Sequence, residues 1–502
     1  MQILTRIPRT SLFTWTLLAL VAASGCRVNE NDIEQWKGTI KGPTKMVAVM
    51  TSTKYPVELK TRAALALVEM DRGDVDGIDE LTHAIQRLDA PARAEIISGL
   101  ADGLESLMRG GEAAAQSDGN AATDLQVRAK DAMFSLIDLA DGPTHDRFVK
   151  AVIDWYSVDF NGRNLAGRTS AEQVIDKLGT AAAARLVDSM NAKIPPAALV
   201  KLAELIGKKG DTETKKRGGD RIVAIEREME GKEFLDWFKA KIRQQAEEAK
   251  RQCDDKCLTQ AAELNRENYL AGGAITAMKH LGSVEAVQAR LLEIAANPSK
   301  TDAMVARRTA ALQALEGKVK EKHLSTLLKL ALDSSVPAGV RDYAFDRVAD
   351  VGSKKAIDPM WPLVANGDDK EQRVRWRAGE LVLSIGGSDV LPTFFAKLPG
   401  GNTKYEPEEL DGYATRMGDM TPPPRTVALE KLKSSAWYER VIALRFLEKR
   451  GLKEDLGAMK ALSSDNAAVN GKAWKNFEWK TVGDVAKDSV EVAEGRLAAG
   501  SS

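Results

Sequence analysis

The chain has 502 residues, too many for one compact core, so several domains or an elongated array are expected. It carries 72 basic and 72 acidic residues, and this balance excludes a general electrostatic attraction to nucleic acid or to anionic lipid. Aromatic residues make up only 5% of the chain, which favours many small helix interfaces over an aromatic-rich core or a β-sandwich.

Residues 1–25 are expected to be a signal peptide and not part of the fold. A short basic region precedes an apolar run of eleven residues at 12–22, which is too short to span a bilayer. The following Ala-Ser-Gly-Cys at 23–26 resembles the lipobox of bacterial lipoproteins, with Ala23 where that family usually has Leu. The resemblance implies that Cys26 is lipidated and becomes the N-terminus. The alternative is an ordinary secretory signal in which Cys26 has no role.

Lipidation would place the protein at a membrane surface of the bacterial cell envelope. No other apolar run approaches 18 residues, so no further segment is expected to cross a membrane. By resemblance to enteric lipoproteins, Arg27 in place of Asp after the cysteine implies the outer membrane, with the protein on its periplasmic face.

Four stretches of the chain begin with Val or Leu and end with Gly twelve residues later. Their first residues, Leu270, Val305, Val340 and Val374, step by 35, 35 and 34. A fixed period of this kind indicates a stacked helical array. A second helical pattern follows each glycine, so every unit is an antiparallel hairpin that buries its apolar side only by stacking.

The stretches resemble the short HEAT-like repeats of bacteria, in which Val-Arg is followed by Ala and a final Gly. Val340 with Arg341 and Val374 with Arg375 match this pattern well. In such repeats the arginine commonly pairs with an acidic group of the adjacent unit, so the resemblance implies that Arg341 and Arg375 are structural inter-repeat residues. The expected fold is therefore all-α, an α-solenoid of stacked antiparallel helix hairpins in two lobes.

Composition and periodicity divide the chain into eight segments. In order they are a signal peptide (1–25), a tether and opening helix (26–54), an irregular helical-repeat lobe (55–206), a charged linker (207–220), a long bridging helix (221–266), regular HEAT-like repeats (267–398), a loop insertion (399–424), and a final helical repeat with a cap and disordered end (425–502).

Two cysteines lie four residues apart on the apolar stripe of the expected long helix. Export implies an oxidising compartment, in which a disulfide between Cys253 and Cys257 would persist. Positions four apart on a helix have Cα atoms about 6 Å apart, within the range that a disulfide spans. The alternative is two small buried residues of the stripe.

The insertion at 399–424 is the expected place for contact with a partner. It interrupts the array with glycines and prolines and is longer than a compact domain usually tolerates without a reason. Aromatic and methionine side chains in it can anchor a partner. The candidates are Tyr405, Tyr413, Met417 and Met420. The alternative is an insertion with no role.

The sequence offers no motif for catalysis or for a metal. The four histidines are isolated from one another, and no HExxH, CxxC, Walker A, nucleophile-elbow or dinucleotide-binding pattern occurs. We therefore expect no enzyme activity, no cofactor and no metal.

The favoured function is a membrane-anchored scaffold that binds an unidentified protein or peptide and no nucleic acid. Two alternatives remain open. One is an enzyme or chromophore-handling protein, by analogy with phycobilin lyases that carry HEAT-like repeats. The other is a purely structural spacer of the envelope.

Overall fold

A computed structural model describes residues 28–70, 76–110, 123–158, 163 and 165–499. Their secondary structure is predominantly helical, and they contain no β-strand beyond an isolated bridge between Ala468 and Thr481. The chain forms two compact units, residues 1–217 and 218–502. The expectation of an all-α fold of stacked antiparallel helix hairpins in two lobes is confirmed. None of the described helices has both the length and the apolar character needed to span a bilayer.

The first unit is a series of helices in which chain neighbours pack against each other, as in the pairs α3 with α4, α6 with α7 and α10 with α11. Its helices are α2 (Glu30–Trp36), α3 (Gly42–Thr51), α4 (Val57–Glu69), α5 (Gly77–Gln86), α6 (Ala90–Arg109), α7 (Asp124–Leu136), η2 (Ile137–Leu139), α8 (Gly142–Val158), α10 (Ala171–Ser189) and α11 (Pro196–Lys209). The boundary between the units lies within α12 (Thr212–Glu230).

The second unit begins in α12 and continues through paired helices to the C-terminal α27. The longer helices are α13 (Lys232–Glu248), α14 (Asp255–Glu267), α16 (Glu285–Ala295), α17 (Asp302–Ala314), α18 (Leu324–Leu332), α19 (Ala338–Val351), α20 (Ile357–Val364), α21 (Gln372–Gly386), α22 (Leu391–Lys397), α23 (Pro407–Gly418), α24 (Arg425–Lys431), α25 (Trp437–Arg450), α26 (Leu456–Lys460) and α27 (Val482–Ala499). The short elements are η3 (Asn268–Ile275), α15 (Thr276–Met278), η4 (Lys279–Leu281), η5 (Glu321–His323), η6 (Lys354–Ala356), η7 (Asp369–Glu371), η8 (Gly387–Val390), η9 (Lys453–Asp455) and η10 (Ala473–Phe477).

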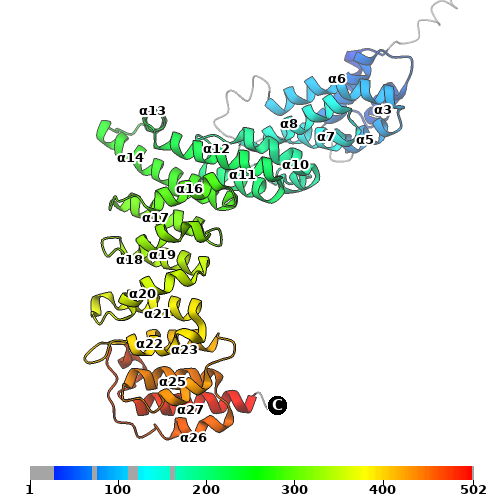
Figure 1. Cartoon of the computed structure of the whole chain (residues 1–502). Helices are drawn as coiled ribbons and strands as arrows, with labels where there is room; N and C mark the ends of the chain where they lie inside the picture. The colour runs from blue at the N-terminus through cyan, green and yellow to red at the C-terminus, as the bar shows by residue number, and fades with distance from the viewer. Residues whose placement is uncertain (1–27, 71–75, 111–122, 159–162, 164, 500–502) are drawn as a thin grey trace, which may run out of the picture. The chain divides into compact units, whose positions relative to one another are not determined.

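Helix α19 shows how the repeat sequence forms its hairpin. Val340, Ala344 and Val348 lie on one helical face and are fully buried. Gly352 ends the helix with a φ of 64°, a left-handed conformation that favours glycine. The first helices of successive hairpins, α17, α19, α21, α23 and α25, each pack on the next, which makes one stack (Figure 1).

The prediction of one long helix at 221–266 is wrong, because the helix is interrupted at two places in this segment. Gly231 is the N-cap that separates α12 from α13, and residues 249–254 separate α13 from α14. Lys250, with a φ of 52°, reverses the chain, and α13 packs against α14. The predicted apolar stripe is therefore not one buried face, because α14 buries Leu258 and Ala262 and leaves Cys257 and Leu264 of the stripe exposed.

In the structure Cys253 and Cys257 form a disulfide, with Cα atoms 5.4 Å apart. It ties the turn before α14 to the first turn of that helix. The loop that it closes is very short, so its entropic contribution to stability is expected to be only about 2 kcal/mol. We expect the double variant Cys253→Ser with Cys257→Ser to lose no more than this in urea unfolding. Neither thiol of the native protein should react with an alkylating agent before reduction, and labelling of either would contradict the bond.

The segment 207–220, expected to be a charged linker, is almost entirely helical. Residues 207–209 end α11 and residues 212–220 belong to α12, so only Gly210 and Asp211 separate the two helices. The Asp211 carboxylate accepts a hydrogen bond from the Thr214 amide at 2.8 Å and so stabilises the start of α12. Two basic residues of the segment pair with α10: Lys209 with Asp176 at 2.6 Å and Arg217 with Asp188 at 3.0 Å.

The prediction of a loop insertion at 399–424 is also wrong. It contains α23, which packs between α21 and α25 as the first helix of a further repeat. Pro407 occupies the first turn of that helix, where proline is tolerated. At the other end of the chain, α27 includes Ala498 and Ala499, which were expected to be disordered; residues 500–502 lie outside the described part.

Candidate functional site

The four residues proposed to contact a partner are buried, so that prediction is wrong. Tyr405, Tyr413 and Met417 are fully buried and Met420 is 8% exposed. The Tyr405 ring stacks on Tyr438, and its hydroxyl donates to the Pro399 carbonyl at 2.8 Å. These side chains form the core of the α23 repeat, because α23 is a stacked helix and not a projecting loop.

Arg375 and Glu409 form a fully buried ion pair between α21 and α23. Both side chains are 0% exposed, and Arg375 donates to the two Glu409 oxygens at 2.8 and 2.9 Å. The Tyr413 hydroxyl donates to the same carboxylate at 2.9 Å. Burial raises the pKa of Glu409, and the hydrogen bonds from Arg375 oppose that rise. The guanidinium also donates to the Lys404 and Asn366 carbonyls, so Arg375 joins two successive repeats.

Arg341 lies at the corresponding position one repeat earlier. It is 5% exposed and donates to the Ala331 carbonyl at 3.1 Å and to Glu371 at 3.3 Å. Glu371 lies just before α21, in the next repeat. In this structure both arginines thus contact an acidic residue of the following repeat.

The surface feature most suited to binding is a groove over α21, α23 and α25. We call it the aromatic groove and define it by Trp376, Trp474, Phe477 and Trp479, which line it. Its volume is about 460 Å³, within the size range of ligand pockets. Phe477 is 43% exposed, although large apolar side chains are usually covered. Tryptophan, with tyrosine and arginine, dominates the energetic centres of protein interfaces.

The segment between α26 and α27 folds back to form one side of the groove. The Trp474 indole donates to the Tyr405 carbonyl at 2.7 Å, and the Lys472 and Ala473 amides donate to Glu406 at 2.9 and 2.7 Å. These bonds join residues about seventy positions apart in the chain. The rings of Phe477 and Trp479 are stacked with centroids 4.7 Å apart.

Glu478, between those two rings, has a φ of 59°. A non-glycine residue in this region stores backbone strain, and such strain clusters at ligand clamps and other functional sites.

The charged groups of the groove are mostly paired with each other. Asp411 accepts from Arg445 at 3.2 Å and from Lys449 at 2.6 Å. Glu380 pairs with Arg377 at 3.4 Å and with Arg416 at 3.6 Å. The Asp411 pairs connect α23 to α25 and the Glu380–Arg416 pair connects α21 to α23, whereas Arg377 and Glu380 both lie on α21. Among the charged residues that the structure describes in this groove, only Glu408, which is exposed, lacks an ion-pair or hydrogen-bond partner.

Two donors beside these pairs are unsatisfied. Trp376 Nε1 and Arg416 Nε are buried atoms with no hydrogen-bond partner in the described part of the chain. Gly412 on α23 leaves room for the Trp376 ring, because a Cβ there would lie 2.6 Å from Trp376 Nε1. Both atoms are therefore enclosed by packed protein and are not open to the groove.

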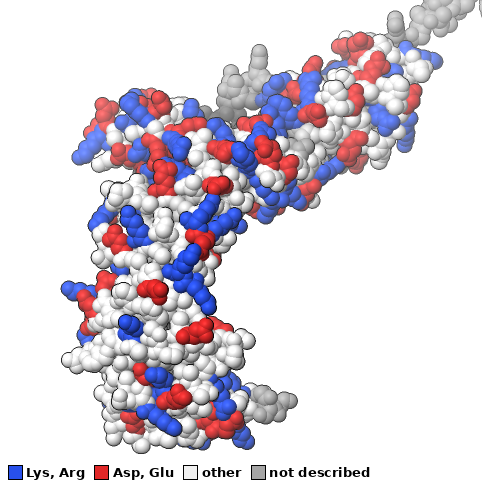
Figure 2. Space-filling view, in the orientation of Figure 1, with Lys and Arg blue, Asp and Glu red and all other residues white. Residues whose placement is uncertain are grey.

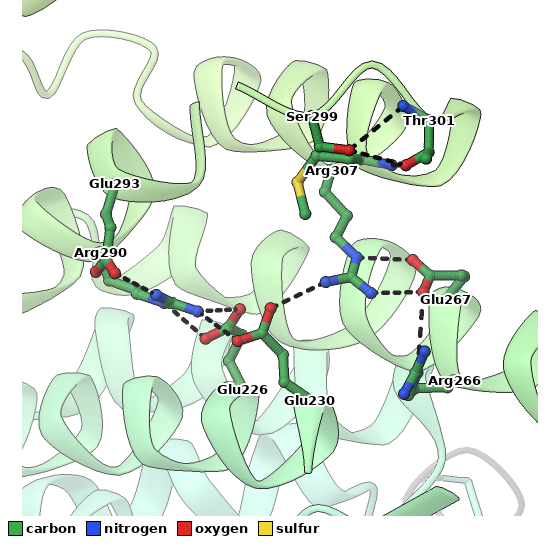
Figure 3. Close-up of polar contacts among 10 residues, drawn as sticks. Glu226, Glu230, Arg266, Glu267, Arg290, Glu293, Ser299, Thr301 and Arg307 are labelled. Atoms are coloured by element: carbon green, nitrogen blue, oxygen red, sulfur yellow. Dashed lines mark hydrogen bonds and ion pairs between the residues drawn. The ribbon is translucent and has the colours of Figure 1, made fainter. Parts of the chain in front are cut away.

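A second cluster of charges, near the start of the second unit, is structural in character. Figure 3 shows the Arg290 guanidinium pairing with both Glu226 and Glu230, with Glu230 also reaching Arg307. Arg307 also donates a hydrogen bond from Nε to the carboxylate of Glu267, on α14, at 2.7 Å. Arg290 joins α16 to α12, and Arg307 joins α17 to both α12 and α14, so these guanidinium groups hold helices together.

The described residues contain no group of three or more His, Cys, Asp or Glu side chains arranged to hold a metal ion. A further cavity of about 380 Å³ lies in the first unit, beside Arg147 and Trp155. Its charges are also paired, as Arg147 is with Glu105 at 2.7 Å. On the face shown in Figure 2, basic and acidic side chains are interspersed, with no extended area of one sign.

The lipidation site could not be placed, because Cys26 lies outside the described residues. The aromatic groove was missed from the sequence. Its signal was the occurrence of Trp474, Phe477 and Trp479 within six residues of a chain with 5% aromatics. That cluster suggested only a terminal cap, and nothing local connects it to Trp376.

No protein-family model matches the sequence, and no curated protein matches it. Among solved structures the chain is similar to the karyopherin Kap121p bound to the SUMO protease Ulp1p, with 13% identity and a TM-score of 0.38. That match covers 97% of this chain and 48% of Kap121p. Kap121p bound to Pho4p matches at 12% identity with a TM-score of 0.32, over 97% and 52% of the two chains. This chain thus spans about half the length of that protein. At these scores the likeness says nothing about what this chain binds.

Proposed function

We propose that this protein is a lipid-anchored scaffold of the bacterial cell envelope that binds a protein partner through the aromatic groove. The observation that supports binding most directly is the groove itself, with the exposed Phe477 held beside Trp474 and Trp479. Stacked hairpins present extended surfaces of this kind for recognition. The lipobox-like sequence that ends at Cys26 supports the anchor.

The anchor is tested by Cys26→Ala. Each buried CH₂ of an acyl chain contributes about 0.8 kcal/mol to membrane affinity, so several chains hold a protein firmly. We expect the variant to move from the membrane fraction to the aqueous fraction on ultracentrifugation. The double variant Cys253→Ser with Cys257→Ser serves as the control and should stay with the membrane. Retention of Cys26→Ala on the membrane would contradict the proposed anchor.

Binding through the groove is tested by site-specific photo-crosslinking of the full chain in its native envelope. A photoreactive phenylalanine analogue replaces Phe477 in one variant and Leu452 in the other. The two side chains are matched, being 43% and 46% exposed, but only Phe477 lines the groove. We expect one discrete covalent product from position 477 and none from 452. Identical products from both positions, or none from 477, would contradict binding at the groove.

A further inference from the structure

The buried arginine of the α17 repeat lacks the carboxylate that its counterparts have. Arg308 on α17 is 2% exposed, and its Nε donates to the carbonyl of Ala295, the last residue of α16, at 2.9 Å. Arg341 and Arg375 make the same kind of contact near the ends of α18 and α20, and each also pairs with a glutamate of the following repeat. Arg308 forms no ion pair with any described residue.

A buried cation without a counter-charge is an exception, because removing an unpaired charge from water is costly. Burial lowers the pKa of Arg308, and the charge of Asp333 opposes this only in part. Burial acts in the same direction on Arg375, but the ion pair with Glu409 raises the pKa of Arg375 above its ordinary value. The protein therefore compensates the charge of Arg308 less well than that of Arg375.

Arg308 lines a cavity at the loops that enter α17 and α19, which we call the inter-hairpin cavity. Its volume is about 210 Å³, smaller than the pockets of about 300–1,000 Å³ that hold drug-sized ligands, so it suits a small group. Unlike Trp376 Nε1, the Nη1 and Nη2 atoms of Arg308 are not enclosed by packed protein, so they remain accessible from this cavity. The polar residues that define the cavity are Lys300, Arg308, Thr326, Lys329, Asp333 and Ser335.

The charges of the inter-hairpin cavity match a small dianion. Its lining includes three basic residues and one acidic residue, so its net charge is +2. Lys300 and Lys329 are exposed and form no ion pair with a described residue. The hydroxyl groups of Thr326 and Ser335 add two uncharged donors. A carboxylate ligand would leave one positive charge uncompensated, whereas a phosphate group carries up to two negative charges and several strong acceptor oxygens.

We propose that the inter-hairpin cavity binds a phosphate group, which gives Arg308 the counter-charge that the following repeat gives to Arg341 and Arg375. The two Nη atoms of Arg308 donate to phosphate oxygens, and Lys300 and Lys329 balance the remaining charge. The phosphate is either free inorganic phosphate or the end of a larger phosphomonoester. This inference does not depend on the aromatic groove or on the membrane anchor.

The test is calorimetric titration of the full chain with inorganic phosphate at neutral pH and constant ionic strength, with acetate as the comparison anion. We expect phosphate to bind more tightly than acetate, and Arg308→Gln to abolish phosphate binding. Lys329→Gln should weaken binding about tenfold, because it removes a charge-assisted hydrogen bond. Lys318→Gln is the matched control: it removes the same charge from the exposed turn after α17, outside the cavity, and should leave binding unchanged.

Titration with glycerol 3-phosphate distinguishes the two sources of the phosphate. Tighter binding of this ester than of inorganic phosphate would indicate the end of a larger ligand, and weaker binding would indicate the free anion. If the native chain binds neither compound, the inference is wrong.

Asp333→Asn separates phosphate binding from folding. The new side chain keeps an oxygen that accepts the hydrogen bond from the Ser335 amide, which is 2.8 Å long in the native chain. Loss of the one negative charge in the cavity should strengthen phosphate binding by about threefold to tenfold. An unchanged or weaker affinity of this variant would overturn the inference. Equal phosphate binding by Arg308→Gln and the native chain, or equal losses for Lys318→Gln and Lys329→Gln, would overturn it too.

Discussion

Arg375→Met is expected to lower the free energy of unfolding of the second unit by about 3–5 kcal/mol. Arg375 and Glu409 are both 0% exposed, and the guanidinium donates to both carboxylate oxygens. Removing the arginine leaves a buried carboxylate whose main remaining donors are Tyr413 and Gln372. Urea unfolding, followed by circular dichroism, measures the loss.

The matched control is Arg377→Met, two residues further along α21. The Arg377 side chain is 26% exposed and pairs with Asp346 and Glu380 on the surface. Partly exposed pairs contribute about 0–1 kcal/mol, so this variant should be near neutral. Adding Glu409→Met to Arg375→Met should recover stability, because well-packed apolar residues often replace a buried ion pair without loss. A loss below about 1 kcal/mol for Arg375→Met alone would show that water reaches Glu409.

The loss should also depend on pH. Burial raises the pKa of Glu409 above its ordinary value, and Arg375 opposes this. In Arg375→Met the folded state therefore holds the Glu409 proton more tightly than the unfolded state does. A raised carboxyl pKa gives stability that is present at low pH and lost as pH rises through the raised value. The variant should thus be less destabilised in mildly acidic buffer than at neutral pH. An equal loss in both buffers would contradict this explanation.

The repeats with a regular apolar pattern could be predicted from the sequence. Val340 and Gly352 mark one face and the end of α19 because helix periodicity and the left-handed glycine are local properties. Residues 407–418 have the same place in the stack but a different composition. There Glu409 lies 34 residues after Arg375, which is one repeat period. The buried face of α23 contains the charged Glu409 and the polar Tyr413. A hydrophobic pattern does not detect a repeat whose core includes an ion pair.

The aromatic groove could not be predicted, because it depends on tertiary contacts. Trp376 and Trp479 come together only because Glu406 and Tyr405 hold the chain around Trp474. The same limit explains the long helix that the apolar stripe suggested. The turn near Lys250 divides that stretch into two helices, and α14 buries Leu258 and Ala262 in place of the stripe residues Cys257 and Leu264. Periodicity identifies an apolar face and says nothing about which residues cover it.

Glu226→Gln is expected to be strongly destabilising, although the same substitution at Glu293 is not. Both carboxylates pair with Arg290, but the Glu226 side chain is 1% exposed and that of Glu293 is 61% exposed. The two Glu226 oxygens accept hydrogen bonds from Nε and Nη2 of Arg290, at 2.8 and 3.0 Å. Breaking a buried pair of this kind costs about 3–5 kcal/mol, whereas an exposed pair contributes about 0–1 kcal/mol.

The destabilisation caused by Glu226→Gln should extend beyond the Glu226–Arg290 pair, because Glu230 joins Arg290 to Arg307 (Figure 3). Residues in one network do not contribute additively. We therefore expect the losses for Arg290→Met and Arg307→Met to differ from their sum when the two are combined. Amide hydrogen exchange should become faster at residues 222–230 of α12 in Glu226→Gln and stay unchanged in Glu293→Gln. Similar exchange in both variants, or additive losses, would show that the two arginines act independently. In that case apolar contacts hold residues 222–230 of α12 to the neighbouring helices, and each buried ion pair stabilises only the two residues that form it.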